Sequence, residues 1–202
     1  MALRNHSLDN KIVDAAFNEF LKKGYRDASL REIAKEAKVT VGAIQNRYKS
    51  KDELFTCLLK PFINDVESTF KNTKIDYFFK TNQDILTKLK SSMGNESKAI
   101  IRLIFDHYDQ AVLLLCKSAG SSLEHYFDEI VQGKIKESIS FFQSIKCISI
   151  DEKLLGFLIS VQFDCYRRIV TECNDRKAAE KYMDSLMIYH FGGWSALFSS
   201  KD

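Results

Sequence analysis

The stretch of sequence that decides the fold is residues 29–53, SLREIAKEAKVTVGAIQNRYKSKDE. Ser29, followed three residues later by Glu32, is a capping box and predicts the start of a helix. The short segment 38–40 leaves room only for a turn, after which Thr40 can cap a second helix. Two short helices joined in this way predict a helix-turn-helix, in which the second helix fits the major groove of DNA.

The charge of the chain agrees with that interpretation. Residues 1–60 carry 12 Lys and Arg against 8 Asp and Glu, whereas residues 61–202 carry 18 against 19. Between Glu36 and Asp52 there is no acidic residue. A basic excess confined to the segment with the turn is what binding to phosphates requires. A helical hairpin with a solvated basic face would explain the charge alone, but caps, turn and charge together favour DNA.

The composition predicts an all-α fold. One proline and eight glycines occur in 202 residues, and no useful length of sequence alternates apolar and polar residues as a strand would. A first helix is expected from about Ser7 to Lys23, with Gly24 as its stop. Ser50 and Glu53 form another capping box. They start a helix of about 50–71 whose apolar period continues across Pro61, which predicts one helix with a kink.

The remaining sequence divides at polar breaks. Further helices are expected at 82–92, 96–106, 108–118, 120–145, 151–173 and 175–198. The breaks between them are Met93-Gly94-Asn95, Ala119-Gly120, Ser144 to Ser149 and Cys173-Asn174, with Asp151 and Asn174 as caps. We expect two domains, a three-helix DNA-binding domain at 1–49 and a helical ligand-binding and dimerisation domain at 50–202, linked by the helix 50–71.

Several classes of function find no support in the sequence. No run approaches the ~20 apolar residues that cross a membrane, and the start MALRNHSLDNK does not look like a signal peptide. The five cysteines are odd in number and form no C-x-x-C pair, which favours reduced thiols and a cytoplasmic location. No histidine or cysteine cluster, nucleophile motif or glycine-rich phosphate loop is present. We therefore expect no enzyme, no catalytic residue, no metal and no cofactor.

The first 60 residues resemble the TetR family of bacterial transcriptional regulators. The resemblance rests on four segments: AAFNEFLKKGY (15–25), SLREIAKEA (29–37), VTVGAI (39–44) and YKSKDEL (48–54). The rest of the chain is similar only in layout, with long final helices and an aromatic Gly-Gly-Trp stretch at 191–194. The resemblance implies an all-helical homodimer with a small-molecule pocket and a four-helix dimerisation bundle in the C-terminal part.

The resemblance also assigns DNA contacts. Residues expected at the groove are Val41, Gly42, Ala43, Gln45, Asn46 and Arg47. Ser29, Thr40 and Lys51 would meet phosphates, and Arg31 would reach a base or a phosphate. A phosphate contact without specificity is the alternative for Arg47, and Tyr48 is expected in the core because it shares a face with Ile44.

Three positions depart from the family pattern. Lys38 stands where the family usually has a turn glycine, which would cost about 1 kcal/mol if its φ is positive. Gln45 stands where a Tyr is usual, and Arg47 where a Tyr or His is usual. Gln and Arg pair well with adenine and guanine respectively, so the expectation is an uncommon operator rather than a loss of DNA binding.

The C-terminal part is rich in aromatic residues, and four of them, Phe62, Phe105, Tyr108 and Tyr126, are our candidates for ligand contact. The last two helices are expected to form the homodimer interface through Leu154, Leu155, Leu158, Ile159, Leu186, Tyr189 and Trp194. The function that follows is a ligand-responsive repressor that binds a palindromic DNA operator as a homodimer, with a small-molecule effector and no membrane partner. The alternative is a helical sensor or adaptor without DNA-binding activity.

Overall fold

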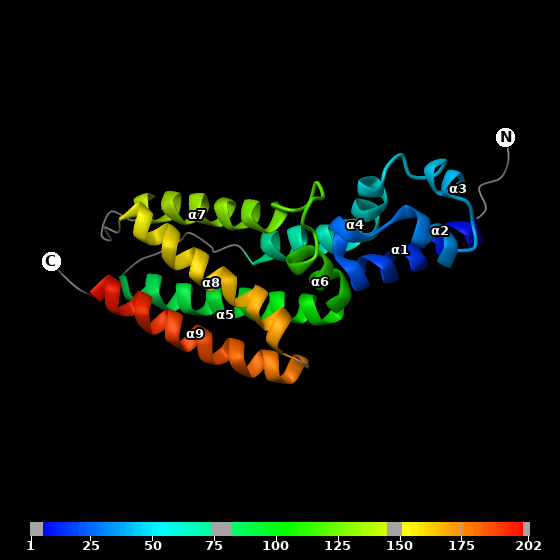
Figure 1. Cartoon of the computed structure of the whole chain (residues 1–202). Helices are drawn as coiled ribbons and strands as arrows, with labels where there is room; N and C mark the ends of the chain where they lie inside the picture. The colour runs from blue at the N-terminus through cyan, green and yellow to red at the C-terminus, as the bar shows by residue number, and fades with distance from the viewer. Residues whose placement is uncertain (1–5, 74–81, 145–150, 174, 200–202) are drawn as a thin grey trace. The chain divides into compact units, whose positions relative to one another are not determined.

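A computed structural model describes residues 6–73, 82–144, 151–173 and 175–199 of the chain, and these ranges contain helices and no strand (Figure 1). The helices are α1 (His6–Asp27), α2 (Leu30–Glu36), α3 (Val41–Gln45), α4 (Lys51–Asn72), α5 (Asn82–Asp106), α6 (Tyr108–Cys116), α7 (Tyr126–Ser144), α8 (Glu152–Glu172) and α9 (Arg176–Ser199). The all-α fold class is confirmed. Within those ranges, no helix combines the length and the apolar character that crossing a membrane would need.

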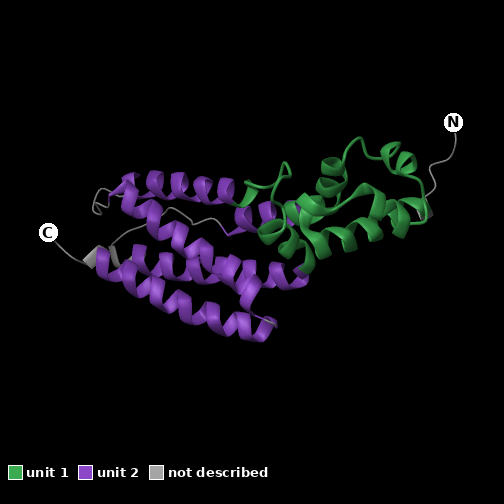
Figure 2. Cartoon of the chain, viewed as in Figure 1, with its two compact units in different colours: residues 1–63, 109–127 green, residues 64–108, 128–202 purple. Residues whose placement is uncertain are grey.

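The chain divides into two compact units (Figure 2). The first contains residues 1–63 and 109–127, and the second contains residues 64–108 and 128–202. The first unit therefore holds α1 to α3, the first half of α4 and nearly all of α6. The second unit holds α5, nearly all of α7, α8 and α9, together with the end of α4.

The core of the first unit is built from one apolar side of each of its helices. The members with no exposed surface are Ile12, Ala16, Phe20, Ile33, Ile44, Leu54, Phe55, Leu59, Ala111 and Leu113. The ring of Phe55 packs edge-on against Phe20, with centroids 4.9 Å apart, and also lies 5.1 Å from the ring of Tyr25. Burying each large apolar side chain contributes about 1.5–3 kcal/mol to folding. This core fixes α2 and α3 against α1 and α4.

Gly24 ends the regular part of α1, as predicted. Its φ of 76° and ψ of 167° interrupt the helical backbone. A residue with a Cβ would be strained at this φ, so glycine is required here. The turn directs the N–H of Tyr25 to the carbonyl of Lys117, 2.9 Å away, and the Lys117 amine reaches back to the carbonyl of Leu21. The end of α1 is thereby tied to the residues that follow α6.

Two long helices show how packing modifies local signals. α4 is continuous through Pro61, which confirms a single helix there. α5 is also continuous, so the predicted break at Met93-Gly94-Asn95 is wrong. Gly94 has open space where a side chain would be, and its carbonyl accepts a hydrogen bond from Ser97 Oγ at 3.0 Å. α5 packs along α9, and its residues Ile85, Leu89, Ile100, Ile101 and Ile104 are buried; this burial outweighs the weak helix propensity of the Gly-Asn pair.

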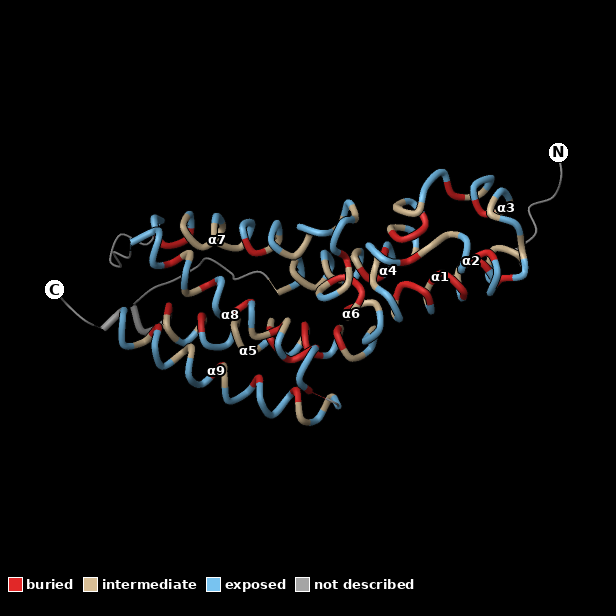
Figure 3. The backbone as a smooth tube through the Cα atoms, viewed as in Figure 1, coloured by how far each residue is buried: buried red, intermediate tan, exposed pale blue. Residues whose placement is uncertain are grey.

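The later boundaries are partly as expected. The helix expected from residue 120 begins only at Tyr126. Gly120 has a φ of 86°, which is not helical, and turns occupy the residues between Gly120 and Tyr126. Asp151 caps α8, as predicted, by accepting the N–H of Leu154 at 2.9 Å. The expected cap Asn174 and most of the expected break at Ser144 to Ser149 lie outside the described residues. At α9 the cap is Asp175, which accepts the N–H of Ala178 at 2.9 Å. In Figure 3, red and pale-blue stretches alternate along α8 and α9, as amphipathic helices require.

Candidate nucleic-acid interface and ligand cavity

The helix-turn-helix forms as the sequence predicts. Ser29 Oγ accepts the N–H of Arg31 at 3.2 Å to cap α2, and Thr40 Oγ1 accepts the N–H of Ala43 at 3.1 Å to cap α3. The turn between the helices places Lys38 at a φ of 57°, the left-handed conformation that most residues avoid. This backbone conformation of Lys38 costs about 1 kcal/mol of folding free energy, which the interactions around the turn offset.

Glu19 accepts the hydrogen bond from the Ser29 N–H that the capping box predicts for Glu32. The N–H of Ser29 donates to Glu19 Oε1 at 3.2 Å, and Glu19 also pairs with Lys23 at 3.0 Å. The side chain of Glu19 is almost fully buried. Glu19 thereby links the turn before α2 to α1. An acidic residue on the inner side of an apolar helix was the signal available in the sequence, because such a residue is rarely buried without partners.

α3 separates its side chains into a buried and an exposed set. Ile44 and Tyr48 are buried, which confirms Tyr48 as a core residue. Gly42, Gln45 and Asn46 are exposed, and Val41 and Ala43 are half-buried. The polar side chains that α3 and its C-cap offer to solvent are therefore the two amides of Gln45 and Asn46, whose donor and acceptor pair matches an adenine edge.

Arg47 is held by the protein itself. Its Nε donates to Asp9 Oδ1 at 2.5 Å, and one terminal nitrogen donates to the carbonyl of Ala43 at 3.1 Å. The Arg47 and Asp9 side chains are 19% and 13% exposed, so solvent screens this ion pair only in part. A guanidinium has five N–H donors, and the unused ones remain able to bind a phosphate or a base.

The Lys51 amine uses more of its hydrogen-bond donors within the protein than the Arg47 guanidinium does. Its amine donates to the carbonyls of Tyr25, Arg26 and Ala28 at 2.7, 3.2 and 3.0 Å. It also lies 4.4 Å from the centroid of the Tyr25 ring. An ammonium has three donors, so all of them are directed at the end of α1. Arg31, by contrast, is exposed on α2, and so are Lys35, Lys38 and Lys49 nearby in sequence.

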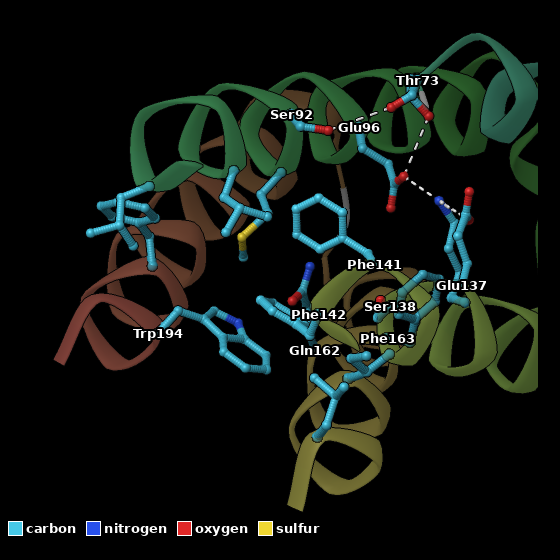
Figure 4. A pocket seen from close by; sticks show the side chains of 17 residues that line it. Thr73, Ser92, Glu96, Glu137, Ser138, Phe141, Phe142, Gln162, Phe163 and Trp194 are labelled. Atoms are coloured by element: carbon cyan, nitrogen blue, oxygen red, sulfur yellow. Dashed lines mark hydrogen bonds and ion pairs between the residues drawn. The ribbon is translucent and has the colours of Figure 1, made fainter. Parts of the chain in front are cut away.

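The second unit contains a cavity of about 110 Å³ (Figure 4). Its wall comes from α5, α7, α8 and α9 and from the residue that follows α4. The lining residues are Thr73, Leu86, Leu89, Ser92, Met93, Glu96, Lys134, Glu137, Ser138, Phe141, Phe142, Leu155, Ile159, Gln162, Phe163, Phe191 and Trp194. Most of these side chains are aromatic or aliphatic, which is usual for sites that bind small organic molecules.

One side of the cavity is charged. Lys134 Nζ lies 2.6 Å from Glu96 Oε2 and 3.9 Å from Glu137 Oε2. The Lys134 and Glu96 side chains are only 17% and 13% exposed. Thr73 Oγ1 donates to the same Glu96 oxygen at 3.4 Å, and Lys134 also lies 4.9 Å from the centroid of the Phe70 ring. The charged side thus contains two carboxylates and one ammonium.

None of the four aromatic residues expected to contact a ligand lines this cavity. Phe62 is buried in the half of α4 that belongs to the first unit. The rings of Phe105 and Tyr108 pack together with centroids 5.5 Å apart, and the Tyr108 hydroxyl donates to the carbonyl of Val170 at 2.9 Å. Tyr126 begins α7. Ligand contact at these four positions stays an untested prediction. The residues that line the cavity, such as Phe142 and Trp194, are aromatic too, so aromatic character alone did not distinguish them.

α8 and α9 keep an apolar surface that the chain does not cover. Leu154, Phe157 and Val161 on α8 are 40%, 60% and 58% exposed, and Ile188 and Tyr189 on α9 are each 75% exposed. Three of the residues expected at a dimer interface are instead buried within the chain, namely Leu155, Ile159 and Trp194. Apolar residues at spacings of three and four lie on one side of a helix, so the α8 residues form a stripe.

Comparison with known proteins agrees with this architecture. Residues 12–57 match the family model for bacterial regulatory proteins of the tetR family. The uncharacterized HTH-type transcriptional regulator YerO of Bacillus subtilis is 25% identical over 123 residues, which are 59% of this chain and 40% of that protein. The chain thus matches less than half the length of this relative.

Two solved structures share the fold of nearly the whole chain. A TetR-like transcriptional regulator from Rhodococcus sp. RHA1 has a TM-score of 0.64 at 15% identity, covering 95% of this chain and 99% of that one. FadR from Bacillus subtilis, solved in complex with stearoyl-CoA, has a TM-score of 0.60 at 17% identity, covering 92% and 98%. The N-terminal segment of the chain is thus similar to bacterial regulatory proteins of the tetR family, and nearly the whole chain shares the fold of solved TetR-like regulators.

Proposed function

We propose that the protein is a ligand-responsive repressor that binds a palindromic operator as a homodimer and leaves the DNA when a small-molecule effector binds. The observation that carries this proposal is the presence, in one chain, of a helix-turn-helix and of an apolar cavity with a charged side. The FadR structure in complex with stearoyl-CoA supports a small-molecule effector for this chain as well.

On the DNA side, we assign base reading to the exposed amides of Gln45 and Asn46. Val41, Gly42 and Ala43 would approach the floor of the groove, since small side chains there let α3 come close to the bases. The capping residues Ser29 and Thr40, with exposed Arg31, would meet phosphates, as helix N-termini do.

The DNA contacts proposed for the basic residues Arg47 and Lys51 depend on which of their hydrogen-bond donors are available. Arg47 reaches a base or a phosphate with the donors that Asp9 and Ala43 leave open. Lys51 reaches a phosphate only if its amine exchanges one of its three carbonyl partners. The specificity of the operator is therefore expected to depend more on Gln45 and Asn46 than on these two cations.

The exposed stripe of Leu154, Phe157 and Val161, with Ile188 and Tyr189, supports dimerisation through α8 and α9. Two copies of this helix pair would bury the stripe in a four-helix bundle. A twofold dimer places two copies of α3 about 34–36 Å apart, or a further helical turn apart, on a palindrome.

Mapping protected DNA around the protein's own gene tests the proposal. The expected result is a palindromic protected site, bound by a species that sediments as a dimer at micromolar concentration. An unprotected region and a monomer would contradict the proposal and would favour a sensor or adaptor without DNA-binding activity.

A further inference from the structure

One polar side chain in the wall of the cavity has an amide group that borders the open space. Gln162 on α8 is only 7% exposed, and its side-chain amide has no hydrogen-bond partner among the residues that the structure describes. Figure 4 shows this amide in the middle of the cavity, close to Trp194 and Phe142. The Gln162 side chain has neither amide atom fully enclosed by protein, so the amide borders the open space of the cavity, where a ligand can hydrogen-bond to it. Gln162 is therefore placed to bind something that enters the cavity.

The surroundings of this amide are aromatic. The rings of Phe142 and Trp194 lie nearly parallel, with an interplanar angle of 19° and centroids 6.4 Å apart. Phe141 meets Phe142 edge-on at 5.1 Å, and Phe163 lines the wall from α8. Offset-stacked and edge-on contacts between rings are favourable beyond the area that they bury. Beside the aliphatic side chains of the wall, these rings offer stacking and edge-on contacts to a flat aromatic ring.

The charged side of the cavity disfavours an anion. Two carboxylates, Glu96 and Glu137, face a single ammonium, Lys134. That ammonium is 2.6 Å from Glu96 and 3.9 Å from Glu137, so both partners already compensate its charge. A carboxylate ligand would have to displace one of them in a site of low polarity, where an unpaired charge is costly.

The size of the cavity limits the ligand further. An apolar cavity of about 150 Å³ holds a benzene molecule. The present cavity measures about 110 Å³, which is of the same order as the space that one such ring occupies. We propose that the cavity binds a single-ring aromatic molecule that is not anionic and that has a polar substituent to hydrogen-bond with the Gln162 amide. That this molecule acts as the effector rests on the proposed function, whereas its binding does not.

Trp194 makes the proposal measurable, because it lines the cavity and is the single tryptophan of the chain. Its fluorescence in the full-length protein reports occupancy without DNA. Three probes separate the features of the proposal. Benzamide has a ring and a polar group, benzoate has the same shape with a negative charge, and toluene has the ring alone.

Benzamide is expected to bind at least about tenfold more tightly than either benzoate or toluene, a difference equal to ~1.4 kcal/mol. Gln162→Leu should remove about tenfold of the benzamide affinity and leave toluene binding intact. Gln132→Leu makes the same substitution at an exposed position of α7 that does not line the cavity, and should behave as wild type. If Gln162→Leu fails to fold, Gln162→Met takes its place.

Three results would overturn the proposal: benzoate binding as well as benzamide, full benzamide affinity in the Gln162 variants, or a Trp194 signal that none of the probes changes. The DNA experiment distinguishes this failure from failure of the proposed function. If the operator is protected but no probe binds, only the ligand class is wrong. If benzamide binds as expected but no DNA is protected, the cavity assignment holds and the repressor assignment does not.

Discussion

Replacing Lys51 by methionine tests what holds the end of α1 against the start of α4. The lysine amine donates to three backbone carbonyls, those of Tyr25, Arg26 and Ala28, at 2.7–3.2 Å. It also lies 4.4 Å from the centroid of the Tyr25 ring. Methionine keeps an unbranched side chain of similar reach but removes the charge and all three donors. The substitution therefore removes the hydrogen bonds and the cation–π contact of the amine, while the apolar part of the side chain keeps most of its packing.

The expected loss is about 2 kcal/mol of the free energy of unfolding, summed from the contributions that the amine makes. A cation at helix C-terminal carbonyls contributes about 0.3–1 kcal/mol, and a cation over an aromatic ring about 0.5–1 kcal/mol. The hydrogen bonds add about 1 kcal/mol rather than three times that, because they share one amine and water can reach the freed carbonyls. With a urea dependence of about 1–3 kcal/mol per molar, the unfolding midpoint should fall by about 1 M.

Urea unfolding followed by circular dichroism measures this change, and Lys60→Met, at an exposed position of α4, is the matched control. The same proteins are then titrated with operator DNA at several salt concentrations. We expect Lys51→Met to be less stable while its salt dependence matches that of wild type. The reverse result, wild-type stability with a salt slope reduced by about 0.9 for each lost phosphate contact, would refute the reasoning. It would show that the amine leaves the carbonyls for the DNA.

Four further substitutions test other parts of the structure. Phe157→Asp places a charge in the exposed apolar stripe of α8, where the side chain is 60% exposed, and should yield a folded monomer in sedimentation. Gln45→Ala should change the preferred base pair at one operator position in a binding-site selection, at a cost of about 1–3 kcal/mol. An unchanged selection would contradict base reading by Gln45. Arg47→Ala should mainly lower thermal stability. Lys38→Gly relieves the positive φ of 57° and should raise the free energy of unfolding by about 0.5–1 kcal/mol in urea; a fall in that energy would show that the turn is not strained.

The parts of the fold that short-range signals determine were predictable from the sequence. Thr40 and Ser29 accept the backbone N–H groups expected of caps, and Gly24 takes the positive φ expected of a helix stop. These interactions join residues only a few positions apart, so their chemistry is visible in the sequence. The α8 cap at Asp151 belongs to the same class.

The parts that depend on distant partners were not predictable. The continuity of α5 through Gly94 depends on packing against α9, and the link between Glu19 and Ser29 joins residues ten positions apart. The cavity residues come from four helices, and whether an aromatic side chain such as Phe142 or Phe105 faces it depends on how those helices pack. Periodicity shows which side of a helix is apolar, but it does not show which neighbour that side meets.

The way Arg47 is held also bears on how such a regulator could acquire a new operator. Its guanidinium is hydrogen-bonded to Asp9 and to the carbonyl of Ala43, so Arg47 helps to hold the helix-turn-helix together. Gln45 and Asn46 are exposed, and substitutions at exposed positions usually change stability by less than about 0.5 kcal/mol. After a gene duplication, these two positions can therefore vary while the contacts of Arg47 are retained. Under the proposed base reading by Gln45 and Asn46, one copy could change its target sequence through substitutions that leave the folded helix-turn-helix intact.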